Sequence, residues 1–138
     1  MRPTGLVLVV DDNEGGRLLA SAVLQREGFQ VDSAGSSDEV LERMNARMPD
    51  LILMDVQLPG QDGLSLTRQL KADPATAAIP IVALTAHAMP SDRDDALSAG
   101  CAGYISKPID TRTLGDLVRG FLAAVEGREV FHLPPPES

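Results

Sequence analysis

Acidic, hydroxyl and amine side chains follow directly on several short apolar runs of this chain. Asp11 and Asp12 follow the first run, Asp55 follows a central one, and Thr85 and Lys107 follow two later ones. Three carboxylates that meet within a few ångströms repel one another, so their pKa values rise unless a cation neutralises them. Carboxylate oxygens are the ligands that hard cations such as Mg²⁺ prefer. The acids therefore predict a Mg²⁺ site, with Mn²⁺ as the alternative metal.

Phosphoryl transfer is the chemistry that this set of side chains suits. A cation bound by carboxylates, with a lysine and a hydroxyl beside it, can neutralise the outer oxygens of a phosphoryl group while a carboxylate acts as nucleophile. Asp55 is the candidate nucleophile because it stands alone after a central run. Taken singly, an aspartate after a strand is commonly a turn or helix-capping residue. The placement of all these residues at the ends of runs favours phosphoryl transfer.

Five strands must bring these side chains together. Short runs of apolar and β-prone residues predict strands over Leu6–Val10, Phe29–Ala34, Leu51–Met54, Ile81–Leu84 and Gly103–Ser106. Strands that are apolar on both faces and alternate with helices indicate an α/β fold, a doubly wound parallel sheet with helices on both sides. Ligands of such sheets bind beyond the carboxyl ends of the strands, where the candidate residues stand.

Helical segments separate and follow these strands. The first, from about Glu14 to Glu27, has Gly15 and Gly16 in its first turn, each of which weakens a helix by about 1 kcal/mol. Ser36 and Glu39 have the spacing of a capping box at the start of the second helix. These signals predict one helix after each of the first two strands.

The last two helices differ in character. The segment around Asp92–Ala99 is short and nearly all polar, which predicts a mobile fourth helix. Apolar residues recur at three- and four-residue steps over Leu114–Val125, with Asp110 or Thr111 as the N-cap and Gly127 closing the end. This periodicity predicts an amphipathic fifth helix against the sheet.

Composition limits the function classes. The 138 residues suit one domain, and a single cysteine, Cys101, cannot form a disulfide within the chain. Absence of a secretory signal or long apolar span predicts a soluble cytoplasmic protein with no membrane association. With 20 acidic and 12 basic residues, the net charge of -8 argues against direct binding to nucleic acid.

The segments that carry the candidate residues resemble the receiver domain of two-component response regulators. The resemblance rests on VVDDN at 9–13, LILMDVQLPGQDG at 51–63, IVALTA at 81–86 and GYISKPI at 103–109. It implies a flavodoxin-like (βα)5 fold with strand order 2-1-3-4-5. The receiver domain would cover residues 1–127, and 128–138 would form a short, flexible tail.

The resemblance also implies roles for individual residues. Asp55 would accept a phosphoryl group from a phosphohistidine of a histidine kinase or histidine phosphotransfer protein. Mg²⁺ would bind Asp12, Asp55 and the backbone carbonyl of Gln57, with Asp11 acting mainly through water. The chain would be no enzyme in the ordinary sense, because it would catalyse only its own phosphorylation and dephosphorylation.

Five residues have implied roles in phosphoryl contact, switching and phosphoryl lifetime. Lys107, joined to the next proline by a cis bond, would pair with the phosphoryl oxygens, and Thr85 would hydrogen-bond one of them. Tyr104 would swing inward with Thr85 and change a surface of the fourth helix, fifth strand and fifth helix; its plainer interpretation is a half-buried core residue. Gln57 and His87 would flank the attacking water, although a solvated loop position is an equal alternative for His87.

Rival classes fit the motifs less well. Phosphatases of the haloacid dehalogenase type need a second acid two residues after the nucleophile, where this chain has Gln57. Nucleotide-binding modules need a glycine-rich loop after the first strand, where this chain has acids. A structural module with inert acids stays open.

A stand-alone receiver is the favoured interpretation because Met1 and the tail look natural; a module from a hybrid histidine kinase or multidomain regulator is the alternative.

Overall fold

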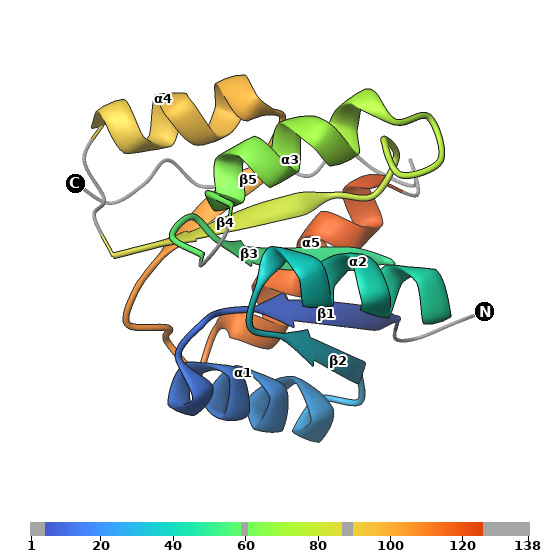
Figure 1. The fold of residues 1–138 in the computed structure, drawn as a ribbon. Helices are drawn as coiled ribbons and strands as arrows, with labels where there is room; N and C mark the ends of the chain where they lie inside the picture. Colours follow the sequence, from blue (N-terminus) through green and yellow to red (C-terminus); the bar gives the residue numbers. More distant parts are fainter. Residues whose placement is uncertain (1–4, 59–60, 87–89, 126–138) are drawn as a thin grey trace.

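A five-stranded parallel sheet lies between two layers of helices in the computed structural model, which describes residues 5–58, 61–86 and 90–125 (Figure 1). The strands are β1 (Leu6–Val10), β2 (Gln30–Ala34), β3 (Leu51–Asp55), β4 (Ile81–Thr85) and β5 (Gly103–Ser106). Their order is β2-β1-β3-β4-β5, and every neighbouring pair is parallel. The expected doubly wound, flavodoxin-like sheet is confirmed.

Burial follows the position of each strand in the sheet. All residues of the central strands β1, β3 and β4 are buried, whereas the outer strands β2 and β5 are partly exposed. Asp55 lies opposite Leu84, and Thr85 lies opposite Ser106. The carboxyl ends of β3, β4 and β5 therefore stop at nearly the same level, where their polar residues meet.

Five helices cover the two faces of the sheet. They are α1 (Glu14–Arg26), α2 (Ser37–Ala46), α3 (Gly63–Ala72), α4 (Pro90–Ala99) and α5 (Leu114–Val125). Helices α1 and α5 pack on one face, and α2, α3 and α4 pack on the other (Figure 1). Successive residues of β1 alternate between these two cores, since side chains of a strand point to opposite faces in turn.

Several element ends differ from the sequence-based expectation. Strand β2 begins at Gln30, and Phe29, expected as its first residue, is instead a buried residue before it. Strands β3 and β4 each extend one residue beyond the expected bounds, so Asp55 and Thr85, expected at the carboxyl ends of these strands, are their last residues. Helix α4 begins at Pro90, where the missing N–H of proline is not needed for a helical hydrogen bond.

Other local expectations concern caps and the proline bond. The Ser36 side chain accepts a hydrogen bond from the Glu39 N–H, which confirms the N-cap of α2. Helix α5 begins at Leu114, after a turn over 111–113, so neither Asp110 nor Thr111 directly precedes it as expected. Asp110 instead begins the turn that leads into α5, where its carboxylate accepts the Arg112 N–H at 2.9 Å and its carbonyl accepts the Leu114 N–H. The bond between Lys107 and Pro108 is cis, as expected.

Some expectations fall on other parts of the chain. His87, Gly127 and the tail at 128–138 lie outside the described residues. Within the described ranges, none of the helices has both the length and the apolar character needed to cross a membrane.

Candidate functional site

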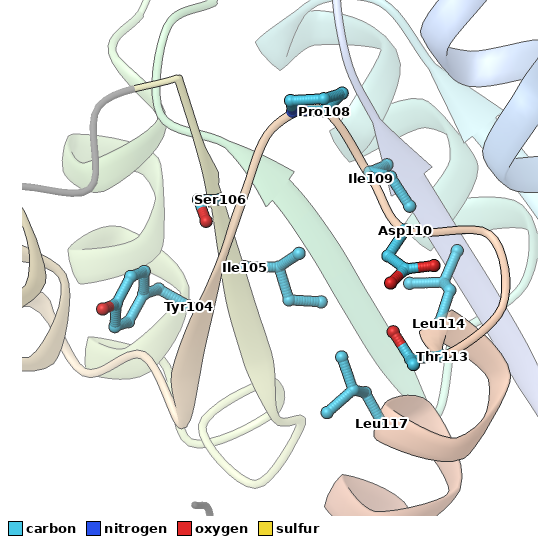
Figure 2. A pocket seen from close by; sticks show the side chains of 9 residues that line it. All are labelled: Tyr104, Ile105, Ser106, Pro108, Ile109, Asp110, Thr113, Leu114 and Leu117. Atoms are coloured by element: carbon cyan, nitrogen blue, oxygen red, sulfur yellow. The ribbon is translucent and has the colours of Figure 1, made fainter. Parts of the chain in front are cut away.

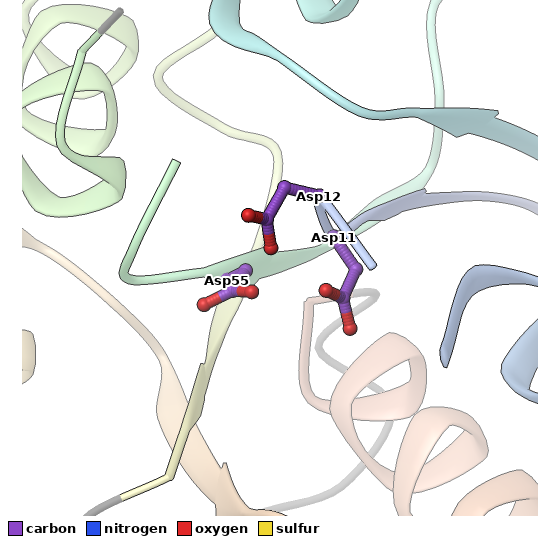
Figure 3. A group of neighbouring side chains, drawn as sticks. All are labelled: Asp11, Asp12 and Asp55. Carbon is purple, nitrogen blue, oxygen red and sulfur yellow. The ribbon is translucent and has the colours of Figure 1, made fainter. Parts of the chain in front are cut away.

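Three carboxylates meet at the carboxyl ends of β1 and β3 (Figure 3). One oxygen of each of Asp11, Asp12 and Asp55 lies within 4.8 Å of the others. Asp11 and Asp55 are 2% and 4% exposed, whereas Asp12 is exposed. The Asp11 carboxylate accepts the Asn13 N–H and the Asp55 carboxylate accepts the Gln57 N–H, both at 2.9 Å. These backbone hydrogen bonds orient the two buried acids.

Lys107 joins two of the acids. Its Nζ lies 2.9 Å from Asp55 Oδ2 and 3.2 Å from Asp11 Oδ2. The Lys107 backbone N–H donates to the Thr85 carbonyl at 2.7 Å, which positions the lysine beside β4. Three carboxylates and one ammonium leave two negative charges in the site when all are ionised.

The donor set fits a hard divalent cation. The three converging side chains offer only oxygen, the ligand type that Mg²⁺ and Mn²⁺ prefer, and the two uncompensated charges match a divalent ion. A hollow of about 530 Å³ beside the acids is lined by Asp12, Gln57 and Asp62, among others. Both Asp12 and Gln57, two of the expected metal-binding residues, therefore border one accessible space.

Burial and charge oppose each other at Asp55 and Lys107. Burial raises the pKa of the Asp55 carboxyl, and Asp11 raises it further, while hydrogen bonds from the Gln57 N–H and Lys107 lower it; the net direction is upward. Burial lowers the pKa of Lys107, but hydrogen bonds and charges of Asp55 and Asp11 outweigh it, so that pKa is raised. Desolvation, more than the repulsion expected from the sequence, disfavours the charge on Asp55.

Thr85 and Tyr104 occupy the expected strand positions. Thr85 is buried at the end of β4, and Tyr104 is half-buried on β5, packed against the core under α2, α3 and α4. Figure 2 shows the Tyr104 side chain on the opposite side of β5 from Ile105, which faces α5. Thr85 thus lies at the same edge of the sheet as Asp55, and Tyr104 lies on the neighbouring strand.

Two supporting residues were missed from the sequence. Arg17 Nη1 donates to the Asp11 carbonyl at 2.8 Å, although nothing in the pattern of α1 distinguishes this arginine from a solvated one. Gly16 lies against the Asp11 carboxylate, where the sequence indicated only a weak first turn. Asn13 is the N-cap of α1, since its side chain accepts the Gly16 N–H at 2.8 Å.

Comparison with known families identifies this arrangement. Residues 7–119 match the model of the response regulator receiver domain. The chain belongs to this family. A phosphoacceptor aspartate and a Mg²⁺-binding acidic pocket are general features of receiver domains, and Asp11, Asp12 and Asp55 form an acidic cluster in this chain.

Individual relatives agree with the assignment. The receiver is 37% identical over 119 residues to the polar-differentiation response regulator DivK of Brucella ovis, covering 86% of this chain and 97% of DivK. The chemotaxis response regulator CheY4 of Vibrio cholerae superposes with a TM-score of 0.79 at 27% identity, covering 84% and 97% of the two chains. The signal receiver domain of a Syntrophus aciditrophicus histidine kinase gives 0.80 at 30% identity, covering 94% and 98%.

Replacing Asp55 by Asn should raise the metal-free melting temperature at neutral pH. Because the folded-state pKa of Asp55 is raised, its ionisation costs stability as the pH rises from its unfolded pKa, about 3.9, through the folded value. Asn retains the shape without the charge, so we expect an increase of about 2–5 °C at pH 7 that shrinks toward pH 4. Calorimetry in the presence of a metal chelator, at pH 7 and at pH 4, measures the melting temperatures of the variant and the wild type. A variant that melts below the wild type at pH 7 would contradict this expectation.

Proposed function

We propose that this chain is a phosphoacceptor response regulator that receives a phosphoryl group on Asp55 from a histidine kinase or a histidine phosphotransfer protein. The observation that carries the proposal is the surroundings of Asp55. Asp55 is the last residue of the central strand β3, and its carboxylate lies 2.9 Å from the Lys107 ammonium. One of its carboxylate oxygens lies within 4.8 Å of an oxygen of Asp11 and of Asp12. The family assignment supports the same role.

The transfer step forms one bond and breaks one. An Asp55 carboxylate oxygen attacks phosphorus, the bond from phosphorus to the donor imidazole nitrogen breaks, and the imidazole leaves with that electron pair. The Lys107 ammonium, which lies 2.9 Å from the Asp55 carboxylate before transfer, then pairs with the negatively charged outer oxygens of the phosphoryl group. The Thr85 hydroxyl donates a hydrogen bond to one of these oxygens.

Four residues would hold the metal. Asp12, Asp55 and the backbone carbonyl of Gln57 would bind Mg²⁺, or Mn²⁺ in its place, and Asp11 would act mainly through water. When bound, the metal supplies positive charge that offsets the acids and the phosphoryl group. Asp11 is buried, and its carboxylate lies 3.2 Å from the Lys107 ammonium. We therefore expect Asp11 to keep this ion pair, which holds Lys107 in position, and not to bind the metal directly.

The same site would catalyse only reactions of its own phosphoryl group. We propose no other enzymatic substrate: water removes the phosphoryl group from Asp55 and ends the signal. The Gln57 side chain is exposed two residues after Asp55, where it can tune access of this water. The tuning role of His87 stays a sequence-based prediction, since that residue lies outside the described ones.

The output surface is proposed on α4, β5 and α5. The carbonyl of Thr85 accepts the Lys107 N–H, and Thr85 lies opposite Ser106, so a shift of Thr85 acts directly on the end of β5. Tyr104 and Ile105 point to opposite sides of β5, and a cavity of about 290 Å³ between β5 and the start of α5 has Tyr104, Ile105 and Leu117 in its lining (Figure 2). This cavity leaves room for side chains of β5 to move when the site changes.

Partners follow from the family at a general level. A kinase or phosphotransfer donor and an unidentified output protein are proposed, with no direct binding to nucleic acid. Similarity to DivK, a response regulator, supports a stand-alone receiver. Similarity to the receiver of a Syntrophus histidine kinase favours the second candidate, a module of a hybrid kinase.

Beryllofluoride, a mimic of the phosphoryl group on Asp55, should change amide exchange mainly in α4, β5 and the start of α5. The expected reason is the backbone path from Thr85 to β5, which lies at the opposite edge of the sheet from β2. Hydrogen exchange read by mass spectrometry measures the effect, with Asp55→Asn as a control that cannot form the adduct. Changes confined to α1 and α2 would exclude the proposed output surface.

A further inference from the structure

We infer that Gly16, in the first turn of α1, is a positioning residue for Asp11. The missing side chain at Gly16 makes the space that the Asp11 carboxylate occupies when it contacts Lys107. This inference rests on the proposed function, because it assigns Gly16 a part in shaping the metal-binding acids.

The distances leave no room for a side chain. A Cβ built on Gly16 would lie 2.7 Å from Asp11 Oδ2 and 3.4 Å from Asp11 Cγ. Contacts below 3.0 Å are essentially never made by real Cβ atoms, so one group would have to move. Oδ2 is the same oxygen that lies 3.2 Å from Lys107 Nζ.

Asp11 has little freedom to move away. Its side chain is 3% exposed, and its other carboxylate oxygen accepts the Asn13 N–H at 2.9 Å. Its backbone N–H donates to Ala34 and its carbonyl accepts from Arg17. A methyl group at Gly16 would therefore break the contact of Oδ2 with Lys107 or the hydrogen bond from Asn13.

Backbone conformation does not explain the glycine. Among the described residues, the glycines with positive φ are Gly28 and Gly100, whereas Gly16 lies within α1. Alanine adopts helical geometry readily and favours it more than glycine does. Space for the carboxylate, rather than a special dihedral angle, is what the position requires.

Gly15 supplies a matched control. It precedes Gly16 in the same turn, and a Cβ there would meet only the Asn13 Oδ1 atom, at 3.2 Å. Gly15→Ala and Gly16→Ala thus add the same methyl group and the same helix propensity, but only the second crowds Asp11.

Metal-free melting temperatures test the steric part. Gly15→Ala should raise the melting temperature by about 3–5 °C through helix propensity. Gly16→Ala should give less than half of that rise in the wild-type background and the full rise in the Asp11→Ala background, where the carboxylate is gone. Equal rises for the two glycine variants in the wild-type background would overturn the inference.

Mg²⁺ binding, measured by calorimetric titration without a phosphodonor, tests the positioning part. Gly16→Ala should weaken binding about tenfold, because the added methyl group would displace the Asp11 carboxylate, and disturbing the groups that orient metal ligands typically costs tenfold or more in affinity. Gly15→Ala should stay within about twofold of the wild type. Failure of the wild-type protein to bind Mg²⁺ would overturn the proposed function, whereas equal binding by both variants and the wild type would overturn the role of Gly16 alone.

Discussion

Asp55→Asn protein should take up no phosphoryl group from acetyl phosphate or from a phosphohistidine donor in the presence of Mg²⁺, whereas the wild-type protein should take up one. The amide of Asn lacks the nucleophilic carboxylate oxygen. Among the described residues, Asp55 alone has both the position at the end of β3 and the 2.9 Å contact to the Lys107 ammonium, so we expect no other acid to replace it as acceptor. Intact-mass spectrometry counts the phosphoryl groups directly.

Asp62→Asn is the matched control for this experiment. Asp62 borders the same hollow as Asp12, but its side chain caps α3 by accepting the Leu64 N–H at 2.9 Å, a role that Asn also performs well. Labelling of this variant should equal that of the wild type. Equal labelling of the Asp55→Asn variant and the wild type would contradict the assignment of Asp55 as acceptor.

Lys107→Met should bind Mg²⁺ about tenfold more tightly than the wild type. The Lys107 ammonium repels a cation: two unit charges about 5 Å apart repel by roughly 3 kcal/mol at an effective dielectric near 20. Because the lysine side chain is 26% exposed, solvent reduces this repulsion to the order of 1.4 kcal/mol, which corresponds to a tenfold change in affinity. Methionine retains an unbranched stem of similar length without the charge. Calorimetric titration measures the dissociation constant.

The same variant should melt at a lower temperature without metal. Asp11 and Asp55 are buried, and removal of Lys107 leaves both without their charged partner. Folding raises the pKa of Lys107, so the charged lysine stabilises the folded state. This contribution to the free energy of unfolding is complete below the unfolded pKa, about 10.4, and is lost as the pH rises through the folded pKa. The difference should therefore persist at pH 8. Lys107→Arg, which keeps the charge, should bind Mg²⁺ like the wild type; tenfold tighter binding by this control too would contradict the electrostatic explanation.

Much of the fold could be predicted from local patterns. Strands β1, β3 and β4 are apolar at nearly every position because both of their faces are buried, and this is visible in the sequence. The weaker patterns of β2 and β5 reflect their outer positions, where Gln30 and Ser106 meet solvent. Phe29 was assigned wrongly to β2 because a buried aromatic residue before a strand has the same composition as one within it.

The candidate site was predictable as a set of strand ends, because parallel strands deliver their carboxyl ends to one edge of the sheet. Asp11, Asp12 and Asp55 were placed together on this basis, and the structure brings them within 4.8 Å. The order of the strands came from the family resemblance, since local periodicity does not specify which strands are neighbours.

The sequence by itself determined the element order, the acids at the sheet edge and the membership of the receiver family. Only the tertiary structure decided how charge is balanced there. Lys107 and Asp55 are 52 residues apart, and their 2.9 Å contact depends on the register of β4 with β5. The space that Gly16 leaves for Asp11 likewise depends on where the first turn of α1 lies against the end of β1. Such contacts arise from packing between elements, and residue patterns within one element carry no record of them.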